Sequence, residues 1–258
     1  MVTETDRKDH NTVLITGASS GIGKALARRF AASGYRIIAA ARRIERLREM
    51  ERELGPNCLA LYMDVADTDS SRAAIGALQE PFSQIDVLIN AAGVALGDAP
   101  AHMTEWGDWE QTISTNVLGL AAVTHAVLPQ MVARRFGDIV NIGSIAASYP
   151  YPKGHVYGAS KAFMRQFTLN LRADLAGFGV RATCIEPGTT VTEFAAVRLG
   201  HDAEKVASVY AGRCLLEAQD VADIVYYAVN LPRHINMNSI EVMAKNQTFS
   251  FFRYADDE

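Results

Sequence analysis

Short, continuous apolar segments alternate with helix-like segments along almost the whole chain, and this alternation constrains the fold more than any other feature. The apolar segments are uninterrupted, which is typical of parallel strands that are buried on both faces. Parallel neighbours in one sheet must be joined by crossovers, and here a helical segment follows nearly every strand. The sequence therefore predicts an α/β fold built on a doubly wound parallel sheet.

The element boundaries follow from the apolar segments and from the Gly, Pro and charged residues between them. Strands are predicted at Thr12–Thr16, Tyr35–Ala40, Cys58–Met63, Val87–Asn90, Ile139–Ile142, Val180–Ile185 and Ser239–Met243. Helices are predicted at Gly21–Ser33, Ile44–Leu54, Thr68–Leu78, within Trp109–Arg135, at Val156–Leu175 and at Ala218–Asn230. This is a single Rossmann-type sheet of about seven strands with helices on both faces.

No repeat, low-complexity tract or linker interrupts this pattern, so we expect one dinucleotide-binding and catalytic domain over residues 12–244. A flexible N-terminus is expected at residues 1–11. The tail at residues 245–258 holds three Phe and one Tyr within six residues. Such an apolar cluster is unusual for a free end, so we expect the tail to dock on a neighbouring subunit.

The charge balance and the scarcity of Cys exclude several classes of protein. The 258-residue chain has 25 basic and 29 acidic residues, a net charge of −4, whereas nucleic-acid binding needs a basic face. No uninterrupted apolar run reaches the roughly 18 residues of a membrane span, and the N-terminus lacks the core of a secretion signal. We expect no nucleic-acid or membrane partner and a cytoplasmic location. The three Cys and six His show no metal-ligand spacing, so no metal site is predicted.

A glycine-rich turn joins the first strand to the first helix and reads Thr16-Gly17-Ala18-Ser19-Ser20-Gly21-Ile22-Gly23. Glycines let the backbone approach a pyrophosphate closely, and the helix N-terminus adds N–H groups and a positive dipole. The spacing G-x-x-x-G-x-G differs from the common G-x-G-x-x-G, and a plain tight turn is the alternative interpretation. Because the turn opens a long strand–helix array, it predicts a dinucleotide site.

The end of the second strand indicates which dinucleotide binds. An NAD site needs a carboxylate near this point for the ribose 2′-hydroxyl, but Ala41 stands there and Arg42 and Arg43 follow. Since arginine can bind a 2′-phosphate, the sequence predicts NADP as the cofactor. The alternative is a solvated start of the next helix, which also carries Arg46 and Arg48.

Three further segments follow strands at the same edge of the sheet. Asp64, after the third strand, can accept a hydrogen bond from an adenine amino group. The turn Asn90-Ala91-Ala92-Gly93, after the fourth, is small enough for backbone to lie against a cofactor. Ser144, after the fifth, stands where ligands bind in such sheets, and its hydroxyl can hold a substrate oxygen.

Tyr157 and Lys161 are four residues apart on a predicted helix and therefore share one face. Tyrosine titrates near pH ~10, and a nearby cation lowers that pKa enough to make Tyr157 an acid or base near neutrality. A solvated helix face is the alternative for such a pair. The apolar stripe beside them is predicted to be Val156, Ala159, Phe163, Phe167, Leu171 and Leu175. Asn116, a poor helix former within the preceding helix, is expected to hold a water or to bend the helix.

In this combination and order, the motifs resemble the short-chain dehydrogenase/reductase family over nearly the whole chain. The first turn looks like the family's cofactor loop, and the Asn90–Gly93 turn like its strand-four turn, with Ala91 where Asn is commoner. Glu186-Pro187-Gly188-Thr189-Thr190 resembles its segment beside the nicotinamide amide. The residues that match its catalytic tetrad are Asn116, Ser144, Tyr157 and Lys161.

The resemblance implies a role for each of these residues. Tyr157 would exchange a proton with the substrate oxygen, and Lys161 would hold the ribose hydroxyls and lower the tyrosine pKa. Ser144 would position the substrate, and Asn116 would support a water in a proton relay. The nicotinamide would give or take the hydride. The predicted cofactor-binding residues are Gly17, Ser19, Ser20, Gly21, Ile22, Gly23, Arg42, Arg43, Asp64, Val65, Asn90, Ala91, Gly93, Tyr157, Lys161, Pro187, Gly188 and Thr190.

A narrower resemblance is to the NADP-dependent 3-hydroxy acid dehydrogenases, carried by segments such as Tyr149–Pro152, Val156–Phe163 and Thr192-Glu193-Phe194. It implies an oxidoreductase for serine, 3-hydroxypropionate or malonic semialdehyde. A sister group reduces sulfoacetaldehyde to isethionate, and the sequence does not choose between the two. Family members commonly form homotetramers, partly through helices equivalent to Asn116–Arg135 and Val156–Leu175.

Two other functions remain as alternatives at this point. A regulator that senses NADP(H) without turnover comes from a different class, but it would need no proton donor. A reductase of bulky ketones would prefer a wide apolar pocket, whereas the Tyr149–Lys153 loop suggests a small one.

Substrates of both related groups carry an anion close to the reacting carbon, and a buried anion needs a cation or several donors. Arg198, just after Thr192-Glu193-Phe194, is the predicted cation, and a solvated arginine is the alternative. Lys153 and His155 are weaker candidates, and Arg253 is another if the tail covers a neighbouring subunit's site. The predicted substrate-binding residues are therefore Ser144, Tyr157 and Arg198.

Overall fold

The computed structural model describes residues 11–211, 213–249 and 254–255. Its centre is a seven-stranded sheet in the order β3-β2-β1-β4-β5-β6-β9, in which every neighbouring pair is parallel. The strands are β1 (Thr12–Thr16), β2 (Arg36–Ala41), β3 (Cys58–Tyr62), β4 (Val87–Asn90), β5 (Gly137–Ile142), β6 (Val180–Pro187) and β9 (Ser239–Val242). The predicted fold class and all seven strands are confirmed.

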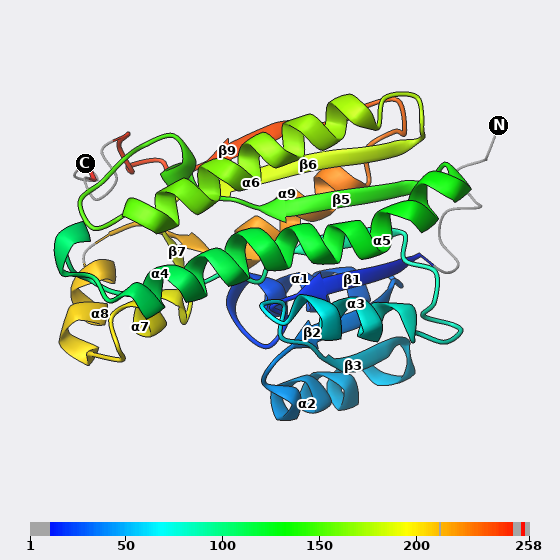
Figure 1. Ribbon diagram of the computed structural model, residues 1–258, viewed down its shortest axis with the longest axis horizontal. Helices are drawn as coiled ribbons and strands as arrows, with labels where there is room; N and C mark the ends of the chain where they lie inside the picture. The colour runs from blue at the N-terminus through cyan, green and yellow to red at the C-terminus, as the bar shows by residue number, and fades with distance from the viewer. Residues whose placement is uncertain (1–10, 212, 250–253, 256–258) are drawn as a thin grey trace.

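Helices cover both faces of this sheet (Figure 1). One face carries α1 (Gly21–Ala31), α2 (Ile44–Leu54) and α9 (Ala218–Val229), and the other carries α3 (Thr68–Gly76), α5 (Leu120–Arg134) and α6 (His155–Asp174). The 3₁₀ turns are Gly55–Asn57, Ala101–Met103 and Ile145–Ala147. The inner strands β1, β2, β4, β5 and β6 are buried on both sides and need no polar alternation, which explains their continuous apolar segments, whereas the edge strands β3 and β9 are partly exposed.

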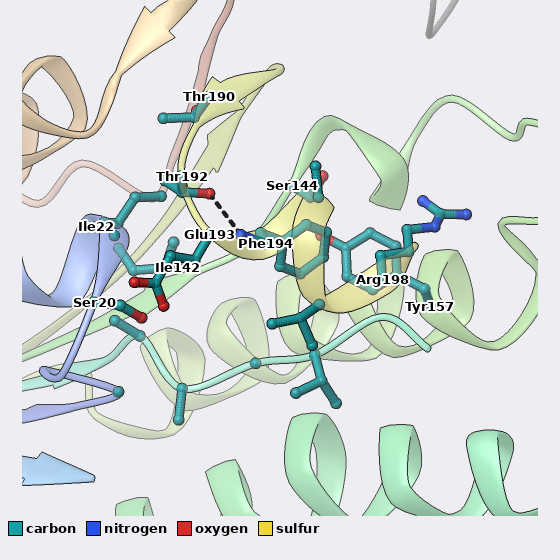
Figure 2. A pocket seen from close by; sticks show the side chains of 18 of the residues that line it. Ser20, Ile22, Ile142, Ser144, Tyr157, Thr190, Thr192, Glu193, Phe194 and Arg198 are labelled. Atoms are coloured by element: carbon teal, nitrogen blue, oxygen red, sulfur yellow. Dashed lines mark hydrogen bonds between the residues drawn. The ribbon is translucent and has the colours of Figure 1, made fainter. Parts of the chain in front are cut away.

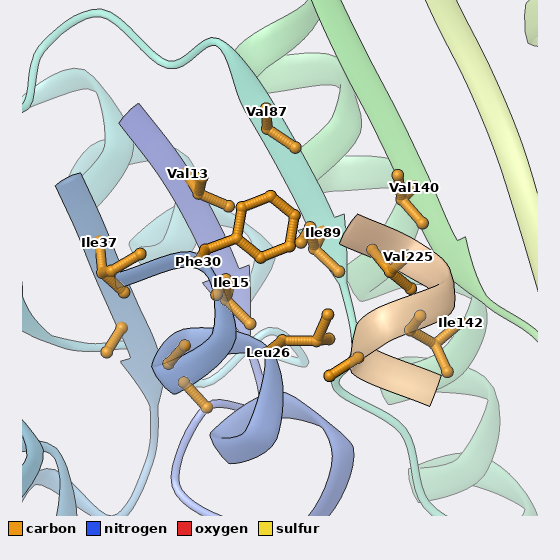
Figure 3. Packing of buried hydrophobic residues seen from close by; sticks show 14 of the residues in the cluster. Val13, Ile15, Leu26, Phe30, Ile37, Val87, Ile89, Val140, Ile142 and Val225 are labelled. Atoms are coloured by element: carbon orange, nitrogen blue, oxygen red, sulfur yellow. The ribbon is translucent and has the colours of Figure 1, made fainter. Parts of the chain in front are cut away.

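The core between β1, β4, α1 and α9 holds the cofactor end of the sheet in place (Figure 3). Phe30 and Leu26 of α1 are fully buried against the sheet, together with Val225 of α9. Each such side chain contributes about 1.5–3 kcal/mol through burial. The turn between β1 and α1 is therefore anchored on two rigid elements.

The strand order reverses between β1 and β4, which makes this the switch point of the sheet. Crossovers leave in opposite directions on the two sides of such a point, so a crevice forms outside the carboxyl ends of the strands. Thr16 ends β1 there, and its Oγ1 accepts hydrogen bonds from the N–H groups of Ala91 and Ala92, both at 3.1 Å. The turns after β1 and β4 thus face one another across this crevice.

Small elements that the sequence pattern did not predict lie at the same edge. They are the two-stranded sheet of β7 (Thr190–Val191) and β8 (Leu216–Glu217), with helices α7 (Phe194–Arg198) and α8 (Ala203–Tyr210) between them. A five-residue helix is too short to produce a recognisable hydrophobic period. The segment lies beside the ends of β6 and α4 in Figure 1.

The apolar stripe predicted for α6 is confirmed only at its C-terminal end, where Leu175 and Leu171 pack into the core. Phe163 is 38% exposed and stacks on Phe167, with ring centroids 5.6 Å apart. The face that is actually buried consists of Ser160, Lys161, Met164 and Thr168. The reason is that the inner side of α6 meets polar groups, as Lys161 does when its Nζ donates to the carbonyl of Ile142 at 2.8 Å.

The long helical stretch Trp106–Arg134 contains a widened turn. It consists of α4 (Trp106–Ile113), a π-helical segment (Ser114–Gly119) and α5. Asn116 lies in the widened turn, so the expected irregularity of the helix is confirmed. The backbone of Gly119 approaches Val65, whose carbonyl oxygen would lie only 2.6 Å from a Cβ at this position.

The same stretch is 29 residues long with a mean hydropathy of 1.4 in its most apolar window, so by length and composition it could cross a membrane. The sequence has no uninterrupted apolar run of this length, and one helix that passes by length and composition alone is weak evidence for a membrane span. The core helix of a soluble protein passes it equally well. Here Val123, Val127 and Met131 of α5 are fully buried against the sheet.

The described part of the tail folds back on its own chain. Gln247 forms an isolated antiparallel bridge with Tyr254, and its Oε1 accepts a hydrogen bond from the N–H of Thr189 at 3.1 Å. Phe249 is 67% exposed, with its ring 5.5 Å from that of Tyr149. Three tail residues named above, Phe251, Phe252 and Arg253, lie outside the described residues.

Candidate active site

A cavity of about 720 Å³ opens at the carboxyl edge of the sheet, beside the switch point. Most of the predicted site residues line it, although they come from segments far apart in the sequence. They are Gly17, Ser19, Ser20, Gly21, Ile22, Gly23, Arg42, Arg43, Asp64, Val65, Ala91, Gly93, Ser144, Tyr157, Lys161, Pro187, Gly188, Thr190 and Arg198.

The glycine-rich turn has a geometry that side chains would prevent. Gly17 has a φ of +71°, and a Cβ there would lie 2.9 Å from the backbone of Ala92. A Cβ on Gly23 would lie 2.4 Å from the carbonyl oxygen of Gly17. The turn can therefore lie close against both the β4 turn and the start of α1. The free N–H groups of the first turn of α1 face an anion site of the kind that binds pyrophosphate.

Arg42 and Arg43, the two arginines predicted for the 2′-phosphate, both line the cavity, and Arg46 on the next turn of the chain shares a partner with Arg43. Arg43 donates to Ser19 Oγ through Nε at 3.1 Å and to Ser20 Oγ through Nη2 at 2.6 Å. Both arginines also donate to the carboxylate of Glu193, at 2.7 Å each. Ala41 ends β2, so this strand supplies no carboxylate of its own for a ribose 2′-hydroxyl; the carboxylate on the arginines comes from Glu193.

Two residues predicted from the sequence do not line the cavity. The side chain of Asn90 points into the sheet, where its Nδ2 donates to Thr124 Oγ1 at 3.1 Å and to Asn141 Oδ1 at 2.8 Å. The sequence predicts that the backbone of this turn lies against the cofactor, and the inward-pointing Asn90 side chain leaves that prediction unchanged. A side-chain amide that is buried in the protein needs hydrogen-bond partners there, and for Asn90 these are Thr124 and Asn141.

Asn116 lies behind the cavity and supports it. Its Oδ1 accepts from the N–H of Val94 at 2.9 Å, and its Nδ2 donates to the Val94 carbonyl at 2.8 Å and to Ser160 Oγ at 2.9 Å. Ser160 in turn donates to the Tyr157 carbonyl at 2.7 Å. Asn116 thus ties the β4 turn to the first turn of α6, and the widened helix makes room for it.

Ser144, Tyr157 and Lys161 converge on one side of the cavity (Figure 2). Ser144 lies between β5 and the 3₁₀ turn Ile145–Ala147, and its Oγ accepts a hydrogen bond from the N–H of Ala146 at 3.1 Å. Tyr157 and Lys161 come from successive turns of α6, with Lys161 Nζ 5.7 Å from the centre of the tyrosine ring. A proton donor, a hydroxyl and a cation therefore lie next to the same space.

Burial governs the protonation of this group. It raises the pKa of Tyr157, an effect opposed by a hydrogen bond with Ser144 and by the charge of Arg198. Burial also lowers the pKa of Lys161 to about 8. The sequence-based expectation was a lowered tyrosine pKa. In the protein alone the reverse holds, because the phenol is packed beside Tyr151 and Phe194 and the ammonium is bonded to a carbonyl.

Helix α7 forms one wall of the cavity and carries Arg198. The ring of Phe194 lies 5.5 Å from that of Tyr157, and the N–H of Phe194 donates to Thr192 Oγ1 at 3.2 Å (Figure 2). Arg198 donates to the Tyr151 hydroxyl and to the Lys153 carbonyl, both at 2.9 Å. The guanidinium therefore joins α7 to the loop after β5, next to Tyr157.

The weaker candidates for the substrate anion have other partners. Lys153 lines the cavity, but its Nζ donates to Asp98 at 2.9 Å. His155 does not line it, since its Nε2 lies 3.2 Å from Thr104 Oγ1 and 3.3 Å from the carbonyl of Ala99. Arg253 lies outside the described residues.

Four residues of this region were not singled out from the sequence for a role at the site: Arg46, Tyr151, Glu193 and Phe194. Arg46 lies 147 residues from Glu193 and was considered part of a solvated helix face. Nothing in the local sequence distinguishes it from Arg48, which pairs with Glu45 three residues away. Only the fold brings α2 and α7 together.

Comparison with known proteins gives a consistent picture. The model of the family described as short chain dehydrogenase matches residues 11–201. The chain is 46% identical over 242 residues to a serine 3-dehydrogenase of Agrobacterium fabrum, an alignment that covers 94% of this chain and 97% of that protein.

Two other relatives and one solved structure are equally similar. The chain is 47% identical over 239 residues to the NADP-dependent 3-hydroxy acid dehydrogenase YdfG of Salmonella typhi, covering 92% of this chain and 96% of the relative. It is 46% identical over 243 residues to sulfoacetaldehyde reductase 2 of Chromohalobacter salexigens, covering 93% and 96%. A structure described as the closed form of serine dehydrogenase complexed with NADP⁺ superimposes with a TM-score of 0.91 at 44% identity, covering 95% of this chain and all of the other.

Proposed function

The chain belongs to the short chain dehydrogenase family, and from this we propose that it transfers a hydride between NADP(H) and a small anionic β-hydroxy acid or its semialdehyde. One observation carries the proposal. Tyr157, Ser144 and Lys161 line the same cavity as Arg198, so that a proton donor and a guanidinium border one space. Serine, 3-hydroxypropionate and malonic semialdehyde are substrates of the right kind.

The cavity fits NADP. The glycine turn can take a pyrophosphate without steric conflict, and Arg43 and Arg46 supply the charge for a 2′-phosphate. Val65 and Asp64 would border the adenine, and residues 187–190 the nicotinamide amide. When bound, the nicotinamide would supply or accept the hydride.

The chain's own groups would handle the proton and the orientation of the substrate. In the direction of reduction, the Tyr157 hydroxyl would donate its proton to the oxygen that develops negative charge. Ser144 would hold the same oxygen by a hydrogen bond, and the Lys161 ammonium would hold the ribose hydroxyls and stabilise the resulting phenolate. Asn116 would fix the position of both turns through Val94 and Ser160.

Arg198 would bind the anionic end of the substrate. Among the described residues its guanidinium donates to two neutral acceptors, Tyr151 Oη and the Lys153 carbonyl, and a carboxylate is a stronger acceptor than either. The distance between the anion and the reacting carbon would then select short substrates. A bulky ketone would gain nothing from this cation.

Reduction of sulfoacetaldehyde is the second candidate, favoured by the 46% identity to a protein of that name. A sulfonate offers a third oxygen and a tetrahedral shape, but it would use the same Arg198 and the same proton donor. The experiment is to follow NADPH absorbance with malonic semialdehyde and, separately, with sulfoacetaldehyde, and to repeat both with NADH. Faster turnover of malonic semialdehyde with NADPH supports the hydroxy-acid assignment, and turnover of neither substrate overturns it.

We also propose a homotetramer in the cytoplasm. Phe163 of α6 and Leu118 of the π-helical segment are 38% and 54% exposed, which leaves apolar surface on the outer side of the two long helices. Cys58 and Cys184 are buried and unpaired, as suits a reducing compartment. The exposed Phe249 and the bridged end of the tail would add to a subunit contact.

A further inference from the structure

Glu193 occupies the anion site that the two arginines form. Its Oε2 accepts from Arg43 Nη1 at 2.7 Å, and its Oε1 accepts from Arg46 Nη1 at 2.7 Å. Arg43 holds Ser19 and Ser20 of the cofactor turn with its other donors. The carboxylate therefore sits at the centre of the group of donors assigned above to the 2′-phosphate.

The Glu193 carboxylate is negatively charged and therefore competes with a phosphate for the two arginines. The hydrogen bond from Arg43, supported by Arg46, holds the pKa of Glu193 below its usual range, so the group is ionised at neutral pH. Arginine donors bind carboxylate and phosphate through the same forked geometry, and two anions on the same donors repel one another. A 2′-phosphate can use Arg43 and Arg46 fully only when Glu193 has withdrawn.

Glu193 also begins the wall that carries Arg198. It is the residue before the first turn of α7, and Thr192 beside it packs against the cofactor turn, where a Cβ on Gly21 would lie 3.2 Å away. Figure 2 shows Glu193 turned toward Ser20, whereas Phe194, the next residue, lies beside Tyr157. The contact with the arginines thus fastens the front end of the substrate wall to the cofactor turn.

We propose that Glu193 is a specificity residue whose carboxylate competes with a 2′-phosphate for Arg43 and Arg46 and so lowers the affinity for 2′-phosphorylated nucleotides. The inference rests on the proposed use of NADP(H). It goes further because it assigns a role in cofactor affinity to a residue that directly precedes α7, the helix that carries Arg198.

The test measures binding, without turnover, of 2′,5′-ADP and of 5′-AMP to the wild type and to Glu193→Gln by isothermal titration. The substitution keeps the shape of the half-exposed side chain but removes its charge. Because the Glu193 carboxylate is about half exposed to solvent, removing its charge should strengthen binding of 2′,5′-ADP about three- to five-fold. Binding of 5′-AMP, which has no 2′-phosphate, should stay within about 1.5-fold.

Glu45→Gln is the matched control. It removes the same charge from the same region, but Glu45 pairs with Arg48 and its side chain is 77% exposed. It should bind both nucleotides as the wild type does. Equal gains in the two variants would mean a long-range charge effect and would overturn the inference.

The outcomes separate this inference from the proposed function. A wild type that prefers 2′,5′-ADP, with a Glu193→Gln variant that binds it equally or more weakly, overturns the role of Glu193 alone. A wild type with no preference for 2′,5′-ADP over 5′-AMP overturns the use of NADP and this inference with it.

Discussion

Lys161 Nζ lies 5.7 Å from the centre of the Tyr157 ring and donates a 2.8 Å hydrogen bond to the carbonyl of Ile142. Both residues come from α6, and the strand that ends at Ile142 holds the Lys161 ammonium. The ammonium is close enough to stabilise a phenolate, yet it is bonded to a neutral acceptor, so the tyrosine keeps its proton in the protein alone. This arrangement suits a residue that must donate a proton.

Replacing Tyr157 by Phe removes the proposed proton donor and leaves the packing against Phe194 in place. We expect kcat for aldehyde reduction to fall by about 10³, within the range for loss of general acid catalysis. NADPH affinity, measured by nucleotide fluorescence, should change less than about two-fold. Tyr151→Phe, in the same cavity, is the control and should keep most of kcat; a similar loss in both variants would contradict the assignment.

The lowered pKa of Lys161 predicts a pH dependence of cofactor binding. With a pKa of about 8, the side chain is a charged donor below that pH and neutral above it. NADPH should therefore bind about five-fold more weakly at pH 10 than at pH 7, as a charged hydrogen bond becomes a neutral one. Lys161→Arg stays charged over this range and should show a flat profile. A flat wild-type profile would rule out this role.

Arg198→Ala should separate charged from neutral substrates. Loss of one charge-assisted hydrogen bond to the substrate anion predicts a KM about 10- to 30-fold higher for malonic semialdehyde or sulfoacetaldehyde. Propanal, which has no anion, should be reduced almost as before. Lys153→Ala serves as the control, because its ammonium is paired with Asp98. Equal losses on charged and neutral aldehydes would remove Arg198 from the substrate site.

If the exposed apolar side of α6 forms a subunit contact, a charge placed there should weaken the assembly. Phe163→Glu should lower the mass measured by sedimentation from that of a tetramer to that of a smaller species, since a carboxylate buried at a subunit contact is unpaired. Phe178→Glu is the control: Phe178 is also exposed, at 45%, but follows the end of α6. An unchanged mass for Phe163→Glu would exclude α6 from the contact.

The buried ion pairs of Asp138 allow a prediction about the free energy of unfolding, at a place far from the cavity. The Asp138 carboxylate accepts from Arg181 at 2.5 Å and from Arg233 at 2.6 Å, and the side chains of Asp138 and Arg181 are each 7% exposed. Asp138→Asn leaves a buried guanidinium without its anion, so urea unfolding at fixed protein concentration should show a loss of about 3 kcal/mol. KM should not change. Asp223→Asn, at an exposed pair with Arg29, should cost less than about 1 kcal/mol.

The sequence by itself determined the seven strands, their main helices and the turns that end them. It could do so because continuous apolar segments and glycine-rich turns are local signals, and parallel pairing then puts all carboxyl ends at one edge. Most of the predicted site residues line the cavity for this reason. Asn90 and Asn116 do not line it, since the direction of a side chain depends on its neighbours in the folded chain.

The tertiary structure decided the rest. In the folded protein the polar face of α6 points inward, because Lys161 and Thr168 find hydrogen-bond partners on β5, and Phe163 lies on the outer side. The fold also brings Glu193 of the short α7 segment onto Arg43 and Arg46, which are about 150 residues earlier in the chain. The sequence does not distinguish one surface arginine or glutamate from another, so only the folded chain determines which of them form ion pairs and which remain solvated.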